Sequence, residues 1–119
     1  MVIADTSIWI VHLRQGHRGF EEMLLNADVA CHQFIIGELA CGNLKNRTEI
    51  LRLLHTLPLV PTISPDELLY FIEQHSLMGK GLGFVDIHLL ASAKLSSVPL
   101  WTKDKKLHEA ALKMNVAYS

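Results

Sequence analysis

The feature that most constrains the fold of this chain is the short run that opens it. Val2-Ile3-Ala4 is apolar at every position, which is typical of a parallel strand covered by helices on both faces. The run ends abruptly at Asp5, and the hydroxyl residues Thr6 and Ser7 follow. We therefore expect a buried strand that brings a carboxylate to one edge of a sheet.

Length and composition predict a single folded domain over residues 1–119. Half of the residues are hydrophobic (50%), which argues against disorder. The net charge of −1 does not indicate a strongly basic nucleic-acid-binding surface, although it leaves room for a local basic face. Two cysteines are too few for a disulfide scaffold, and no segment has the pattern of a secretion signal or a membrane span. We expect a soluble, cytoplasmic protein with no membrane partner.

Strand-like and helix-like segments alternate along the chain, which predicts an α/β fold with a central parallel sheet of four to five short strands flanked by helices. Short apolar runs predict strands at 2–4, 29–31, 57–60, 98–102 and 116–118. Helical patterns occupy 8–16, 20–25, 33–41, 46 or 48 to 54, 65–77, 84–93 and 107–112.

Three further acids, Glu38, Asp86 and Asp104, lie beside or inside apolar segments. Asp5 and Asp104 follow strands, and ligands of open α/β sheets bind beyond the carboxyl ends of the strands. Asp86 opens a helix after the glycine-rich stretch 79–83, and Glu38 reaches the same edge if its helix packs across it. Four converging acids are predicted to meet at this edge.

Four ionised carboxylates in one place repel each other unless a cation lies between them. Their hard oxygen ligands suit Mg²⁺ or Mn²⁺, which also bind phosphate oxygens. Such a site hydrolyses phosphodiesters through a metal-bound water. Lys103, together with Lys105 and Lys106, flanks Asp104 and could contact a polyanion, although lysines at such a position are more often part of a solvated helix start.

Four segments in order resemble the PIN-domain ribonucleases, and most closely the VapC toxins of bacterial toxin–antitoxin pairs. They are Val2-Ile-Ala-Asp5-Thr-Ser7, Ile36-Gly-Glu38-Leu39, Gly83-Phe-Val-Asp86-Ile-His-Leu-Leu-Ala-Ser92 and Leu100-Trp-Thr102-Lys-Asp104-Lys-Lys-Leu107. The resemblance spans essentially the whole chain.

This resemblance implies a PIN-like three-layer sandwich and a metal-dependent endoribonuclease that acts as a toxin. It implies that Asp5, Glu38, Asp86 and Asp104 form the catalytic metal site, supported by the hydroxyls of Thr6 or Ser7 and of Thr102. It also implies cleavage of RNA with Mg²⁺ or Mn²⁺, a homodimer, and inhibition by a cognate antitoxin.

Other interpretations remain open. Each Asp, taken alone, is equally typical of a helix cap, and Glu38 of an ion pair with a lysine. Zinc is disfavoured because no two of the seven histidines stand four apart on a predicted helix. The glycine stretch 79–83 is neither a P-loop nor a Rossmann motif, so a flexible turn is the better interpretation. A non-catalytic PIN-like interaction module and a metal-dependent phosphatase are the alternative functions.

Overall fold

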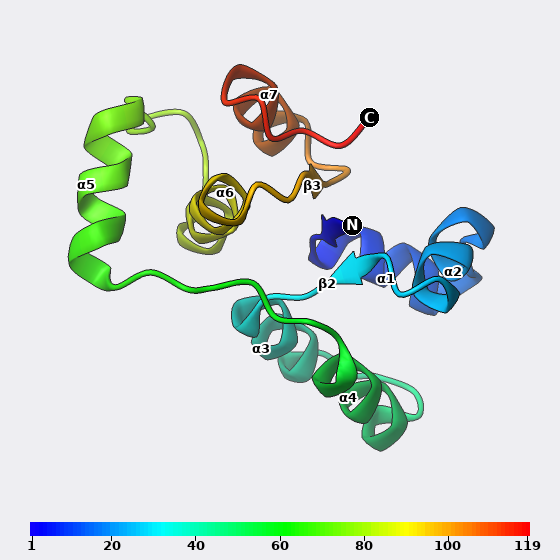
Figure 1. The fold of residues 1–119 in the computed structure, drawn as a ribbon. Helices are drawn as coiled ribbons and strands as arrows, with labels where there is room; N and C mark the ends of the chain where they lie inside the picture. The colour runs from blue at the N-terminus through cyan, green and yellow to red at the C-terminus, as the bar shows by residue number, and fades with distance from the viewer.

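The computed structural model describes all of residues 1–119, arranged as seven helices around a small sheet (Figure 1). In chain order the elements are β1 (Val2–Ala4), α1 (Thr6–Gln15), α2 (Arg18–Leu25), β2 (Val29–Ala30), α3 (Gln33–Cys41), α4 (Arg47–Thr56), α5 (Pro65–His75), α6 (Phe84–Ser96), β3 (Leu100–Trp101) and α7 (Lys105–Lys113). All seven predicted helices are present.

The sheet is parallel, with the strand order β2-β1-β3. Ile3 of β1 lies opposite Ala30 of β2 on one side and opposite Leu100 of β3 on the other. The register with β3 continues past the strands, because the amide of Asp5 donates to the carbonyl of Trp101 at 3.0 Å. This register brings the residues that follow β1 and β3 side by side.

The number of strands is smaller than the predicted four to five. The segments at 57–60 and 116–118 each make one parallel bridge, between Leu59 and Cys31 and between Ala117 and Leu100. Pro58 and Pro61 flank Leu59, and proline has no amide hydrogen to donate to a ladder, so pairing cannot extend there. Both segments therefore run parallel to the neighbouring strand at the edge of the sheet, but neither is long enough in its pairing to count as a strand.

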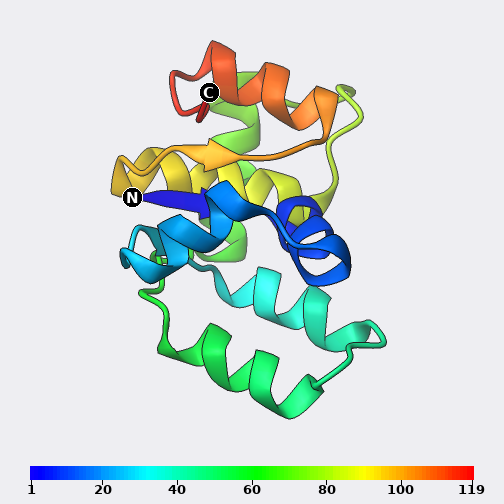
Figure 2. The ribbon, with the colours of Figure 1, turned by 90° about the vertical axis from the view of Figure 1, so that its right-hand side faces the viewer.

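Helices cover both faces of the sheet and produce the expected three layers (Figures 1 and 2). Helix α2 lies against one face, and α6 lies against the other with α5 outside it. Beyond the sheet edges, α7 packs beside β3, and α4 packs outside α3. Figure 2 also shows that α6 and α7 begin on the side toward which β1 and β3 point.

The buried hydrophobic core stabilises this arrangement of helices and strands. Residues 2–4 are completely buried, as expected for a strand covered on both faces. The largest buried side chains include Trp9, Phe20 and Leu90, which come from the layers on either side. None of the seven helices combines the length and the apolar character that a membrane crossing needs.

Candidate active site at the carboxyl ends of the strands

Asp5 is the buried acid of the candidate site. It follows β1 directly, is only 6% exposed, and caps α1 by accepting the amide of Ile8 at 3.3 Å. The hydroxyl of Ser7 donates to its Oδ1 and the hydroxyl of Thr102 donates to its Oδ2. Both carboxylate oxygens therefore accept hydrogen bonds from hydroxyl groups.

Burial sets the electrostatics of Asp5. Desolvation raises the pKa of its carboxyl above the usual value, and hydrogen bonds from Ser7, Thr102 and Ile8 offset part of that rise. An ionised carboxylate in this position is costly unless a positive charge compensates it. The position is one in which a bound cation would be stabilising.

Asp104 lies beside Asp5 because β1 and β3 are neighbours. It caps α7 by accepting the amide of Leu107 at 3.1 Å, and its side chain is exposed. Its own amide donates to the hydroxyl of Thr102 at 3.0 Å, which is the hydroxyl that contacts Asp5. Thr102 therefore links the carboxylate of Asp5 to the backbone of Asp104.

Ser7, in the first turn of α1, also contacts the loop between β3 and α7. Its hydroxyl oxygen accepts a hydrogen bond from the amide of Lys103 at 3.0 Å, and the same hydroxyl donates a hydrogen bond to the carboxylate of Asp5. The Lys103 side chain is exposed at this edge.

Glu38 approaches from α3, which packs against α1. Its Oε1 accepts a hydrogen bond of 2.6 Å from the hydroxyl of Thr6, the first residue of α1. Glu38 is exposed, so this contact orients the carboxylate at the surface beside the residue that follows Asp5. Glu38 therefore lies next to Thr6, and its place in a shared acidic site stays a prediction.

Asp86 lies in the first turn of α6 and is half-buried. Its Oδ2 accepts a hydrogen bond from the amide of Gly83 at 3.0 Å. This is one of the two hydrogen bonds of a capping box, and the second is missing because glycine has no side chain to accept it. No hydrogen bond joins it to the other three acids. The structure therefore does not bring Asp86 into contact with the other acids, and only the side on which α6 begins relates it to them (Figure 2).

The donor set suits Mg²⁺ or Mn²⁺, although no three His, Cys, Asp or Glu side chains lie together as a ready-made metal group. The four candidates supply only carboxylate oxygens, which these ions prefer. Asp86 and Asp104 each use one oxygen for a backbone amide, which leaves the other oxygen available. By the chemistry of its ligands the set fits a hard divalent ion.

Sequence reasoning missed His32, which positions the helix carrying Glu38. His32 is completely buried and caps α3, with Nδ1 accepting the amide of Phe34 at 3.0 Å. Its Nε2 contacts the Ser92 hydroxyl at 3.1 Å, and Ser92 donates to the carbonyl of Pro61 at 2.6 Å. Burial, followed by the charge of nearby His88, lowers the pKa of His32 to about 4. The only sequence signal was a histidine directly before a predicted helix.

A sequence model of the PIN domain matches residues 2–113, nearly the whole chain. The chain therefore belongs to the PIN-domain family, the class that the parallel sheet and its acidic edge define.

Within the family, the chain is 41% identical over 118 residues to a protein called Ribonuclease VapC32, from two strains of Mycobacterium tuberculosis. The match covers 98% of this chain and 95% of the relative. The fold is similar to that of PAE2754 from Pyrobaculum aerophilum, with a TM-score of 0.65 and 13% identity. That alignment covers 96% of this chain and 94% of the other, and it supports the fold alone.

Proposed function

We propose that this protein is a metal-dependent endoribonuclease that hydrolyses RNA phosphodiester bonds and acts as the toxin of a toxin–antitoxin pair. The observation that carries the proposal is the hydrogen-bonded connection from Asp5 through Thr102 to Asp104, with Glu38 reaching the same edge. The full-length similarity to a protein named as a VapC ribonuclease supports it independently.

In this mechanism Asp5, Glu38, Asp86 and Asp104 hold Mg²⁺ or Mn²⁺. When bound, the ion supplies a water of lowered pKa as nucleophile and neutralises charge on the phosphodiester. Ser7 and Thr102 hold the two oxygens of Asp5 in fixed directions, and Thr6 does the same for Glu38. Fixing the ligands in this way lowers the cost of organising the site when the ion binds.

Lys103 is an exposed residue next to Asp104 and carries a positive charge. Its backbone amide is fixed to Ser7, which keeps the residue at the edge of the site. We assign it to electrostatic attraction of the RNA backbone, which makes binding dependent on salt.

A groove beside the site suits an inhibitory antitoxin segment. It has a volume of about 540 Å³ between α1, α3 and α4, and Thr6 and Glu38 form part of its wall. Apolar side chains such as Ile10 and Leu39 line it, with Arg14 and Lys45 among its polar residues. A peptide lying there would pass next to Glu38 and block access to the acids. An RNA substrate and a cognate antitoxin together imply a cytoplasmic location.

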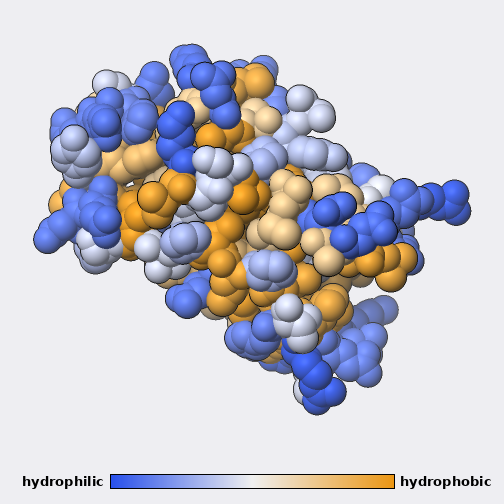
Figure 3. Space-filling model, viewed as in Figure 1, coloured by the Kyte–Doolittle hydropathy of each residue, from blue (hydrophilic) through white to orange (hydrophobic).

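We also propose the homodimer that the resemblance implies, with α5 and α6 as its surface. Leu69, Tyr70 and Leu95 are each more than half exposed on these two helices. Figure 3 shows hydrophobic side chains among polar ones on the face where Figure 1 places α5 and α6. Sedimentation equilibrium of the wild type and of Tyr70→Glu tests this surface: we expect a dimer and a monomer respectively.

The experiment that tests the function is digestion of total cellular RNA by the purified protein with Mg²⁺, with Mn²⁺ and with excess chelator. We expect discrete fragments with either metal and none with chelator. Fragments that persist unchanged in chelator would exclude the metal mechanism. A folded protein that leaves every RNA intact would favour the non-catalytic interaction module.

A further inference from the structure

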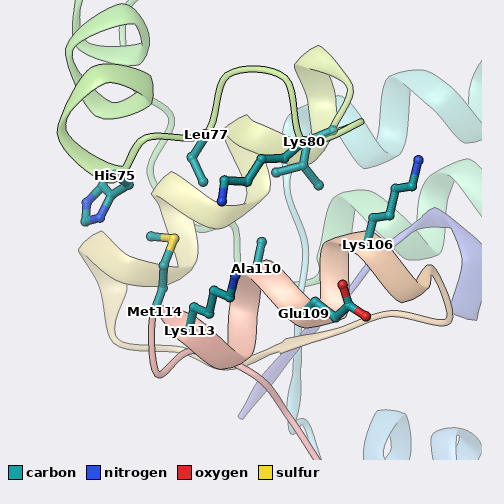
Figure 4. A pocket seen from close by; sticks show the side chains of 9 residues that line it. His75, Leu77, Lys80, Lys106, Glu109, Ala110, Lys113 and Met114 are labelled. Carbon is teal, nitrogen blue, oxygen red and sulfur yellow. The ribbon is translucent and has the colours of Figure 1, made fainter.

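A second polar cavity lies outside the acidic site, between α7 and the loop that joins α5 to α6 (Figure 4). Its volume is about 190 Å³. The residues that line it are His75, Leu77, Lys80, Leu82, Lys106, Glu109, Ala110, Lys113 and Met114. Three lysines, one histidine and a single acid line it, so its side chains carry a net positive charge.

The glycine-rich stretch 79–83 builds one wall of this cavity. Gly79 and Gly81 have φ values of +71° and +75°, a conformation that side chains other than glycine rarely adopt. A Cβ at Gly81 would lie 2.7 Å from Nζ and 2.9 Å from Cδ of Lys106. The Lys106 side chain therefore crosses over Gly81 and would have to shift to make room for a Cβ there. The positive φ angles and this close approach account for the glycines at these two positions.

The ammonium groups of Lys80 and Lys113 both point into the cavity (Figure 4). Figure 4 shows Lys80 from the loop and Lys113 from α7 extending into the cavity, whereas the carboxylate of Glu109 is turned toward the Lys106 side. The cavity floor is apolar, with Leu77, Ala110 and Met114 almost completely buried. Two like charges that converge over an apolar floor repel each other, so an anion between them is stabilising.

The size and the position of the cavity indicate which kind of anion it can bind. Pockets for drug-sized ligands enclose about 300–1,000 Å³, so this cavity suits a small group such as a phosphate. Lys106 is two residues from Asp104, and Lys80 lies on the loop that leads into Asp86. Lys106 and Lys113 are seven residues apart on α7, about 10 Å along the helix axis. The cavity therefore runs outward from the acidic edge along one helix.

We propose that this lysine cavity binds a backbone phosphate of the RNA at a position away from the bond that is cut. The inference rests on the proposed nuclease function, and it names Lys80 and Lys113 as RNA-binding residues. They contact phosphate and not base edges, so they contribute affinity and direction of the strand without sequence selectivity.

The test measures binding of a fluorescent single-stranded RNA oligonucleotide, in chelator to prevent cleavage, across a range of salt concentrations. The test variant is Lys80→Gln/Lys113→Gln. The matched control is Arg18→Gln/Arg52→Gln, which removes the same charge from exposed positions on α2 and α4. Circular dichroism checks that both variants are folded.

We expect the lysine variant to bind roughly tenfold or more weakly near 0.1 M salt. We also expect the slope of log K against log salt to fall by about 0.7, since the cavity binds one phosphate and each phosphate contact of a single strand contributes about 0.7. The control keeps the wild-type affinity within a small factor and keeps the slope.

Lysine and control variants with equal affinity and slope would overturn the cavity assignment. A wild type that shows no RNA binding would overturn it as well. If the wild type cleaves RNA and the lysine variant binds RNA normally, only the proposed role of the cavity is wrong. A wild type that binds RNA through these lysines but never cleaves it would remove only the nuclease.

Discussion

The hydroxyl of Thr102 donates a hydrogen bond to Oδ2 of Asp5, across 97 positions of the sequence. The same hydroxyl oxygen accepts the amide of Asp104 at 3.0 Å. One side chain therefore fixes both the direction of a buried carboxylate and the start of the helix that carries a second acid. The geometry of the candidate site depends on Thr102 as much as on the acids themselves.

Replacing Thr102 with valine keeps the shape and removes both hydrogen bonds. We expect a loss of cleavage of about 10- to 100-fold, as for other groups that orient metal ligands. We also expect a loss of about 1–3 kcal/mol in unfolding free energy, because the buried Asp5 oxygen loses its donor. RNA cleavage rates and urea unfolding measure the two effects.

Thr102→Ser is the matched control, since it restores the hydroxyl. It should recover most of the activity, although it removes a buried methyl group. A Thr102→Val protein with wild-type cleavage, or a Thr102→Ser protein as inactive as the valine variant, would contradict the positioning role.

Asp5→Asn should separate activity from stability. Asparagine is an equally good helix cap, so α1 keeps its start, but the charge is lost. Because burial raises the pKa of Asp5, the ionised form is less stable in the folded protein than in the unfolded chain. Without metal we expect an inactive protein with equal or higher stability, by up to about 1 kcal/mol. A strong loss in urea midpoint would show that Asp5 is mainly structural.

Glu38→Gln tests the acid that lies outside the strand ends. Glu38 is exposed, so we expect unchanged stability. As a metal ligand it should be needed for ion affinity, so the Mn²⁺ concentration giving half-maximal cleavage should rise by about tenfold or more. Glu73→Gln, an exposed acid on α5, is the control and should leave the metal requirement unchanged. Identical Mn²⁺ curves for both variants would remove Glu38 from the ligand set.

His32 predicts a loss of stability in mild acid. Its pKa is about 4 in the folded protein and near 6.5 when unfolded, so protons bind the unfolded chain more tightly. The stability that neutral His32 contributes is complete above pH 6.5 and is lost as pH falls from 6.5 toward 4. At pH 5 the loss should be of the order of 1–2 kcal/mol.

Unfolding free energies at pH 7 and pH 5 measure this effect. His32→Asn is the control, because asparagine caps helices without titrating in this range. It should show a smaller difference between the two pH values than the wild type. An equal difference in both proteins would assign the acid sensitivity to other groups.

The sequence predicted the helices well, because they follow from local patterns such as Pro65-Asp66-Glu67, which begins the helix predicted at 65–77. The convergence of the four acids stays a prediction, because no three of them lie together as a metal-binding group. Strand number was wrong because pairing depends on neighbours: the prolines around Leu59 limit that segment to one bridge. His32 and the lysine cavity were missed because their partners lie far away in sequence. The contact between Gly81 and Lys106, for example, has no local signal.

The most direct test of the acidic site compares Asp86→Asn with Asp66→Asn. Both residues are acids in the first turn of a helix, α6 and α5 respectively, although Asp86 is half-buried and accepts the amide of Gly83 whereas Asp66 is exposed. The measurement is cleavage of total cellular RNA in Mn²⁺ by the wild type and the two variants. We expect full activity for Asp66→Asn and no detectable fragments for Asp86→Asn, with both proteins folded. Equal cleavage by the two variants would contradict this expectation.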